Sequence, residues 1–320
     1  MDVKTVPTFK TAFENEVFQG LTAFPKFLSS KWFYDEQGDK LFQEIMKLPE
    51  YYPTRKEYAI LEQLDVHAFE VDEEGFDLIE LGAGDGFKTK VLLKKLREAN
   101  IPFSYKPIDI SQNALDGLSA DLKNRFPKLD VEPLQGRYFT VLDELSKYSQ
   151  RKKVILMLGS NLGNLPHPKA IEFLRQLGDT LNPQDLIFMG FDLKKDPAVI
   201  LPAYNDSQGV TAAFNKNVLH RINRELKANF EVDHFRHVPL YDPETGTCKS
   251  FLMATQEMDV RIESLDLEVH FYKWETIHTE ISQKYEHSVI KWLCSEAGLH
   301  PKTYFTDEED YFADYILTKT

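Results

Sequence analysis

The sequence predicts an α/β protein: a doubly wound parallel sheet interrupted by a second region of mixed helices and strands. From about residue 75, continuous apolar runs alternate with amphipathic stretches, and such runs are typical of parallel strands covered on both faces. The alternation stops near residue 200 and resumes near residue 283, so an insertion large enough to form a subdomain is expected. The expected domains are therefore residues 62–196 with 283–320, and residues 1–61 with 197–282.

The first predicted strand ends in a glycine-rich turn. The apolar run Leu78–Leu81 contains one acid, Glu80. Three glycines follow at alternate positions: Gly82, Gly84 and Gly86. Glycines allow backbone angles closed to other residues and let a ligand approach the main chain closely. A helix begins near Lys88, and its amide dipoles point back toward the turn, so the pattern predicts a nucleotide-like ligand.

The later elements are predicted from the same periodicities. A second strand over residues 103–110 carries Asp109 near its end, where an acid can bind two ribose hydroxyls. Ser111 is expected to cap a helix that continues to Phe126. The remaining elements are strands at 131–134, 154–158 and 186–191, a helix at 171–181 ended by Pro183, a helix at 200–232, strands at 248–254, 258–262 and 265–276, a helix at 282–297 and a strand at 311–317.

Charge, cysteine content and the N-terminal sequence narrow the function. A net charge of -13 argues against nucleic-acid binding, because the phosphate backbone would repel the protein. Two cysteines are too few for a disulfide framework, and His234, His237 and Cys248 lack a fourth ligand, so no metal site is expected. The lack of a signal-peptide pattern and of a long apolar run predicts a cytoplasmic protein with no membrane partner.

The form of the glycine turn indicates which nucleotide is bound. A dinucleotide-binding turn usually reads G-x-G-x-x-G, whereas this one reads E-x-G-x-G-x-G, which resembles the first motif of S-adenosylmethionine-dependent methyltransferases. No P-loop sequence occurs. The fourth strand is not followed by the [DN]-P-P-[YF] motif of N6-adenine and amide methyltransferases, so another acceptor is expected. A nicotinamide-dependent oxidoreductase remains the alternative on this pattern alone.

Five longer blocks extend the resemblance over nearly the whole chain. They are residues 32–35, 48–55, 159–165, 209–215 and 279–282. Together they resemble the histidine-specific Nα-methyltransferases of ergothioneine biosynthesis. The resemblance implies a Rossmann-like class I methyltransferase sheet with an inserted α+β substrate-binding subdomain. It also implies that S-adenosyl-L-methionine is the cofactor and that L-histidine is methylated three times on its α-amine to hercynine. A monomer is expected, although the sequence does not report the oligomeric state.

The resemblance implies a role for each matching residue. The expected cofactor contacts are Tyr34, Gly82, Gly84, Lys88, Asp109, Arg137 and Tyr138. The expected histidine contacts are Tyr51, Asn164, Tyr204, Glu280 and Ser282. Tyr34 and Asn164 are the expected catalytic residues. Because imidazole offers one donor and one acceptor nitrogen, a carboxylate beside a hydroxyl can bind both.

Three positions depart from the family pattern. Arg137 stands where an acid commonly meets the adenine, Asn161 where a small hydroxyl residue is usual, and Ser250 near the position of a methionine that lines the imidazole pocket. The last two departures leave open an acceptor of the same chemistry but another aromatic type, such as tryptophan or tyrosine.

Several of the expected site residues also have structural interpretations. Glu280 and Ser282 are compatible with a capping pair that begins the helix predicted at residue 282. Lys88 is compatible with a solvated charge on a lysine-rich helix. If the substrate roles hold, Tyr51 and Glu280 must converge on one small molecule, so residues 1–61 and 197–282 are expected to pack together over the carboxyl edge of the sheet.

Overall fold

The computed structural model describes residues 9–71, 73–148 and 151–320, and the chain divides into two compact units. We call Pro53–Lys194 with Gln283–Thr320 the sheet unit, and Met1–Tyr52 with Lys195–Ser282 the insertion unit. The first boundary falls after Tyr52 and not after residue 61 as the sequence suggested. Helix α3 (Tyr52–Gln63) is responsible, because Leu61 near its end and Leu64 just after it are buried in a core of the sheet unit.

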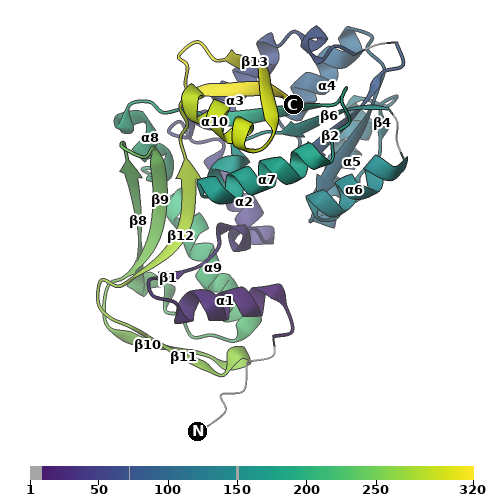
Figure 1. Cartoon of the computed structure of the whole chain (residues 1–320). Coiled ribbons are helices and arrows are strands. Elements are labelled where there is room, and N and C mark those ends of the chain that lie inside the picture. The colour runs from purple at the N-terminus through teal and green to yellow at the C-terminus, as the bar shows by residue number, and fades with distance from the viewer. Residues whose placement is uncertain (1–8, 72, 149–150) are drawn as a thin grey trace. The chain divides into compact units, whose positions relative to one another are not determined.

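The sheet unit is built on an eight-stranded sheet (Figure 1) with the order β13-β14-β7-β6-β2-β3-β4, to which β5 adds a pairing with β3. The strands are β2 (Phe76–Leu81), β3 (Phe103–Asp109), β4 (Asp130–Val131), β5 (Leu134–Gln135), β6 (Lys152–Met157), β7 (Leu186–Asp192), β13 (Leu299–Thr306) and β14 (Phe312–Lys319). Strands β2 to β7 pair in parallel, whereas β14 runs antiparallel to β7 and β13 antiparallel to β14. The predicted doubly wound α/β fold is confirmed.

Helices cover both faces of this sheet, and each face has its own core. They are α3, α4 (Thr89–Glu98), α5 (Gln112–Arg125), α6 (Tyr138–Tyr148), α7 (His167–Asp179) and α10 (His287–Glu296). On β2, Leu78 belongs to the core that includes α4 and α5, whereas Ile79 belongs to the core that includes α7 and α10. This alternation follows from the two-residue period of a strand and explains why the strands read as continuous apolar runs.

Two predictions for the sheet unit were wrong in detail, and one strand was missed. The strand expected at 131–134 is two short strands, β4 and β5. Strand β13 was not predicted, because most of its side chains are at least partly exposed and give no apolar signal. The helix expected from Ser282 begins at His287, because β12 (Thr276–Gln283) of the insertion unit continues through Ser282.

The insertion unit combines a four-stranded sheet of order β1-β12-β9-β8 with the hairpin β10-β11 and four α-helices. Its further elements are α1 (Ala12–Thr22), β1 (Lys26–Phe27), the 3-10 turn η1 (Ser30–Phe33), α2 (Glu36–Ile45), α8 (Pro197–Tyr204), α9 (Val210–Leu226), β8 (Phe235–Asp242), β9 (Thr247–Ala254), β10 (Met258–Ile262) and β11 (Leu267–Phe271). Phe33, Val218 and Phe235 belong to a single core, which brings α9 against the sheet and the N-terminal segment.

The long helix predicted at 200–232 is two helices, α8 and α9. The carboxylate of Asp206 accepts hydrogen bonds from the backbone N–H groups of Val210 (2.9 Å) and Thr211 (2.7 Å), which caps α9. Gly209 adopts φ +75°, and this left-handed conformation breaks the helical path. The strand predicted at 265–276 is likewise divided, since β11 ends at Phe271 and β12 begins at Thr276. Strand β8 was not predicted.

None of the helices in the described part of the chain has the length and apolar character needed to cross a membrane.

Candidate functional site

The glycine turn after β2 is open to a ligand. Gly82, Gly84 and Gly86 all have positive φ angles, as the sequence predicted. A side chain at Gly82 would lie 2.7 Å from the hydroxyl oxygen of Tyr138, whereas no atom lies within 4 Å of the corresponding position at Gly84. The main chain at Gly84 is therefore accessible, and the hydroxyl of Tyr138 lies against the turn.

Asp109 lies beside this turn, at the end of β3. Its Oδ2 accepts a hydrogen bond from the N–H of Gly84 (3.3 Å), and its Oδ1 accepts one from the N–H of Ser111 (2.9 Å). Because each carboxylate oxygen has two lone pairs, both can still accept from a ribose hydroxyl.

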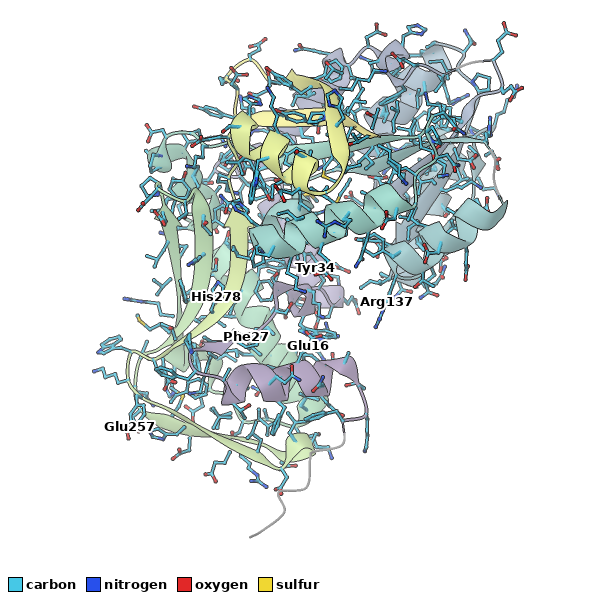
Figure 2. The ribbon with its side chains drawn as sticks, in the orientation of Figure 1. Glu16, Phe27, Tyr34, Arg137, Glu257 and His278 are labelled. Carbon is cyan, nitrogen blue, oxygen red and sulfur yellow. The ribbon has the colours of Figure 1, made fainter. Side chains whose placement is uncertain are left out.

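Arg137 is exposed just before α6 (Figure 2). Burial and the negative charges of Asp109 and Glu80 raise the pKa of Tyr138 to about 12, so its hydroxyl remains a donor.

The acid of the glycine motif, Glu80, is buried and hydrogen-bonded within the protein. Thr89 donates to Oε1 (2.6 Å) and the phenol of Tyr105 donates to Oε2. Burial outweighs these hydrogen bonds and raises the pKa of Glu80 to about 7. Glu80 thus ties the start of α4 to β3 beneath the turn.

Lys88 forms an ion pair with a carboxylate that the sequence did not single out. Its Nζ contacts Oε2 of Glu57, a fully buried residue on α3. The same carboxylate accepts the backbone N–H of Gly159, at 2.8 Å from Oε1 and 3.0 Å from Oε2. Lys88 is therefore not a solvated charge on the surface of α4. Glu57 lies on the apolar face of α3 with Ile60 and Leu61. An acid on the apolar face of a helix indicates a buried carboxylate, and this was the signal by which the sequence could have revealed Glu57.

The loop after β6 carries Asn161 and Asn164 in the 3-10 turn η3 (Asn161–Asn164). Ser160 adopts φ +58°, and its hydroxyl accepts the N–H of Asp192 (2.8 Å), which fixes the loop to β7. The side chain of Asn161 donates to the carbonyl of Leu158 (3.0 Å). Asn164 is exposed, so its amide is available to a ligand.

In the insertion unit, α9 holds the turn that carries Tyr34. The Asn217 amide donates to the carbonyl of Phe33 (2.9 Å) and to Oδ1 of Asp35 (2.8 Å). Arg221 donates to the carbonyl of Tyr34 (3.1 Å). Tyr34, labelled in Figure 2, is 42% exposed, so a fixed backbone carries an accessible side chain.

Tyr34 and Tyr51 belong to one group of aromatic rings. Phe42 makes edge contacts with both, with ring centroids 5.7 Å from Tyr34 and 6.2 Å from Tyr51. Phe214 of α9 lies 5.3 Å from Tyr34. The N-terminal segment and the inserted segment therefore supply adjacent rings within this unit.

The other expected substrate residues lie on or against β12. The hydroxyl of Tyr204 donates to Oγ of Ser282 (2.8 Å), and the hydroxyl of Ser250 donates to Oε2 of Glu280 (3.3 Å). Glu280 and Ser282 are two residues apart on a strand and so share a face. They do not cap a helix, because α10 begins at His287. His278, labelled in Figure 2, donates from Nε2 to the carbonyl of Glu280 (3.0 Å).

The expected residues thus form two groups, one in each unit. Gly82, Gly84, Lys88, Asp109, Arg137, Tyr138 and Asn164 belong to the sheet unit, and Tyr34, Tyr51, Tyr204, Glu280 and Ser282 to the insertion unit. Within the described residues, no three His, Cys, Asp or Glu side chains are grouped so as to hold a metal ion. The open glycine turn and the Asp109 carboxylate fit the ribose and methionine parts of S-adenosylmethionine.

Comparisons with known proteins agree over most of the chain. A family model described as histidine-specific methyltransferase, SAM-dependent, matches residues 13–319. The chain is 39% identical over 298 residues to the histidine N-alpha-methyltransferase of Mycolicibacterium smegmatis, which covers 92% of this chain and 91% of the relative. Identity to the enzyme of the same name from Mycobacterium tuberculosis is 37% over 309 residues, or 96% and 95% of the two chains. Ergothioneine biosynthesis protein 1 of Neurospora crassa is 30% identical over 90% of this chain and 32% of its own length.

Proposed function

The chain belongs to the family of SAM-dependent, histidine-specific methyltransferases, and we propose that it methylates the α-amine of L-histidine three times, giving hercynine. S-adenosyl-L-methionine supplies an electrophilic methyl group on a sulfonium. The names of the bacterial relatives support the α-amine as the acceptor, and that of the fungal relative supports a place in ergothioneine biosynthesis.

Residues of the sheet unit are proposed to bind the cofactor. Asp109 would accept the two ribose hydroxyls, and the main chain at Gly82 and Gly84 would line the methionine part. Tyr138, which remains protonated, would pack near the adenine. Lys88 has its ammonium fixed by Glu57 and would place a positive charge toward the cofactor's carboxylate. The geometry of Asp109 and of the turn supports these roles.

The choice of histidine rests on one observation, the pairing of acid and hydroxyl along β12. Glu280 can accept the N–H of an imidazole, and the Ser282 hydroxyl can donate to its other nitrogen. Tyr204 donates to Oγ of Ser282, which holds this hydroxyl in position on β12. Tyr51 and Asn164 are proposed to bind the carboxylate and orient the amine as neutral donors, and Tyr204 to support Ser282 through its hydrogen bond. Tyr34 and Asn164 would align the amine with the methyl group, since in-line displacement depends mainly on alignment.

The experiment is mass spectrometry of the twenty amino acids incubated with protein and S-adenosylmethionine. We expect histidine alone to gain three methyl groups, because an indole or phenyl ring leaves Glu280 or Ser282 unpaired at about 1–3 kcal/mol for each group. Glu280→Ala should lose most of the preference for histidine over tyrosine and tryptophan but retain S-adenosylhomocysteine binding. Equal rates of the parent on all three amino acids would refute the histidine assignment.

A further inference from the structure

A buried carboxylate connects the two loops of the sheet unit that carry the proposed cofactor and amine contacts. Glu57 is fully buried on α3, yet its partners come from elsewhere in the sequence: Lys88 at the start of α4 and Gly159 after β6. Lys88 follows the glycine turn, and Gly159 begins the loop that ends at Asn164. Any shift of the Glu57 carboxylate therefore moves both loops.

The surrounding backbone leaves space for this carboxylate. A side chain at Gly190 on β7 would lie 2.5 Å from Oε1 of Glu57, and one at Gly159 would lie 3.3 Å from Nζ of Lys88. A glycine inside a strand generally weakens it and often marks a close approach of another group. The glycine at position 190 is thus explained by the space that the Glu57 side chain needs, and Gly159 also by its positive φ of +84°.

A second buried acid lies next to this cluster. Asp314 on β14 pairs in register with Gly190 and is fully buried. Burial and the charge of Glu57 raise the pKa of Asp314 well above its usual range. Glu57 accepts the N–H of Gly159 with both oxygens and contacts the Lys88 ammonium, whereas the raised pKa of Asp314 favours its neutral form.

We propose that Glu57 is a positioning residue for the cofactor: it fixes the Lys88 ammonium and the Gly159 amide in the arrangement that binds S-adenosylmethionine. The proposal rests on the proposed function, because Lys88 must contact the cofactor. It predicts that Glu57 and Lys88 act as one unit in binding, so the effects of their substitutions are not additive.

The test is calorimetric titration with S-adenosylhomocysteine of the parent, Glu57→Gln, Lys88→Met and the double variant, each checked by circular dichroism for folding. Gln keeps the size of Glu but is uncharged, so it cannot form an ion pair with the Lys88 ammonium. Each single variant should bind S-adenosylhomocysteine about tenfold more weakly than the parent. The affinity of the double variant should lie no more than about threefold below that of the weaker single variant. The hypothesis is overturned if Glu57→Gln binds within about twofold of the parent, or if the two losses multiply.

A matched control separates positioning from general destabilisation. Asp185→Asn alters another buried ion pair of the same unit, Asp185 with Lys153, and should leave the affinity for S-adenosylhomocysteine unchanged. An equal loss of affinity in this variant would overturn the proposal. If Glu57→Gln does not fold, Glu57→Asp takes its place: it keeps the charge but is one methylene too short to reach both partners, and unchanged affinity would again refute the idea.

The titration does not depend on the acceptor. A parent protein that binds S-adenosylhomocysteine but does not methylate histidine would refute the proposed function and still decide the role of Glu57. A parent that methylates histidine while Glu57→Gln retains full affinity would refute the role of Glu57 alone.

Discussion

At the scale of single residues, Asp109 combines a structural and a ligand-binding geometry. Its carboxylate accepts the N–H groups of Gly84 and Ser111, so its position is fixed before a ligand arrives. A group fixed in this way loses little conformational entropy on binding, which favours affinity.

Asp109→Ala should therefore weaken binding of S-adenosylhomocysteine. Each hydrogen bond between a ribose hydroxyl and an ionised acid contributes about 1.5–3 kcal/mol, so two lost bonds reduce affinity by at least two orders of magnitude. Calorimetric titration measures the change. Asp116→Ala removes an exposed acid of α5 and serves as the control. Equal affinities of Asp109→Ala and the parent would place the nucleotide elsewhere.

Glu80 makes the stability of the fold depend on pH. Burial raises its pKa from 4.5 to about 7. Between these values the folded protein keeps a proton that the unfolded chain has lost, so the contribution of Glu80 to stability falls as the pH rises through this window. Glu80→Gln cannot ionise, so the unfolding free energy of the variant relative to the parent should rise by up to about 3 kcal/mol between pH 5 and pH 8. Urea denaturation at both pH values measures it, and a constant difference would contradict the assigned pKa.

At the scale of elements, α9 acts as the support of the Tyr34 turn. Its side chains donate to three consecutive residues of that turn: Asn217 to Phe33 and Asp35, and Arg221 to Tyr34. The capping of α9 by Asp206 sets where this helix begins. The position of the phenol thus depends on a helix far away in the sequence.

Asn217→Ala should reduce both stability and activity. It removes two hydrogen bonds, to the carbonyl of Phe33 and to Oδ1 of Asp35, at a total cost of about 1–3 kcal/mol. The freed turn should lower the rate of histidine methylation by about tenfold. Asn223→Ala is a matched control, because the Asn223 side chain also makes two hydrogen bonds from α9, both to the backbone of Phe230. Urea denaturation measures the loss of stability, and initial rates of histidine methylation measure the loss of activity. Similar activities of the two variants would show that α9 does not orient Tyr34.

At the scale of the whole molecule, the carboxyl and amino ends of the parallel strands in the large sheet have different roles. The carboxyl ends of its parallel strands carry the proposed ligand contacts, as expected for an open α/β sheet. At the amino ends of β6 and β7, Nζ of Lys153 and Oδ2 of Asp185 form a buried ion pair of 2.7 Å. Asp185 also accepts the N–H groups of Lys153 and Asn182.

Asp185→Ala should therefore destabilise the protein without affecting its ligand site. A buried lysine left without its acid costs about 3–5 kcal/mol of unfolding free energy. Thermal unfolding measures this loss, and calorimetry below the transition should show affinity for S-adenosylhomocysteine within about twofold of the parent. A large loss of affinity would mean that the Lys153–Asp185 ion pair is energetically coupled to the ligand site.

The sequence by itself determined the features that depend on local pattern. The glycine turn, the alternating strands and helices from β2 to β7, and the insertion were predicted because each has a period or a backbone requirement readable over a few residues. The family was also identified from short blocks, and the family model confirms it. The expected ligand contacts stay predictions of that resemblance, supported for Asp109 and Gly84 by their contact across 25 residues.

Only the tertiary structure decided the pairings of groups far apart in the chain. Glu57 and Gly159 are separated by 102 residues, and neither sequence segment signals the other. The assignment of α3 to the sheet unit, and the continuation of β12 through Glu280 and Ser282, were likewise determined by partners and not by propensity. The physical reason is that a buried charge or an exposed strand is stabilised by neighbours that the fold supplies, and these leave no periodic trace in the local sequence.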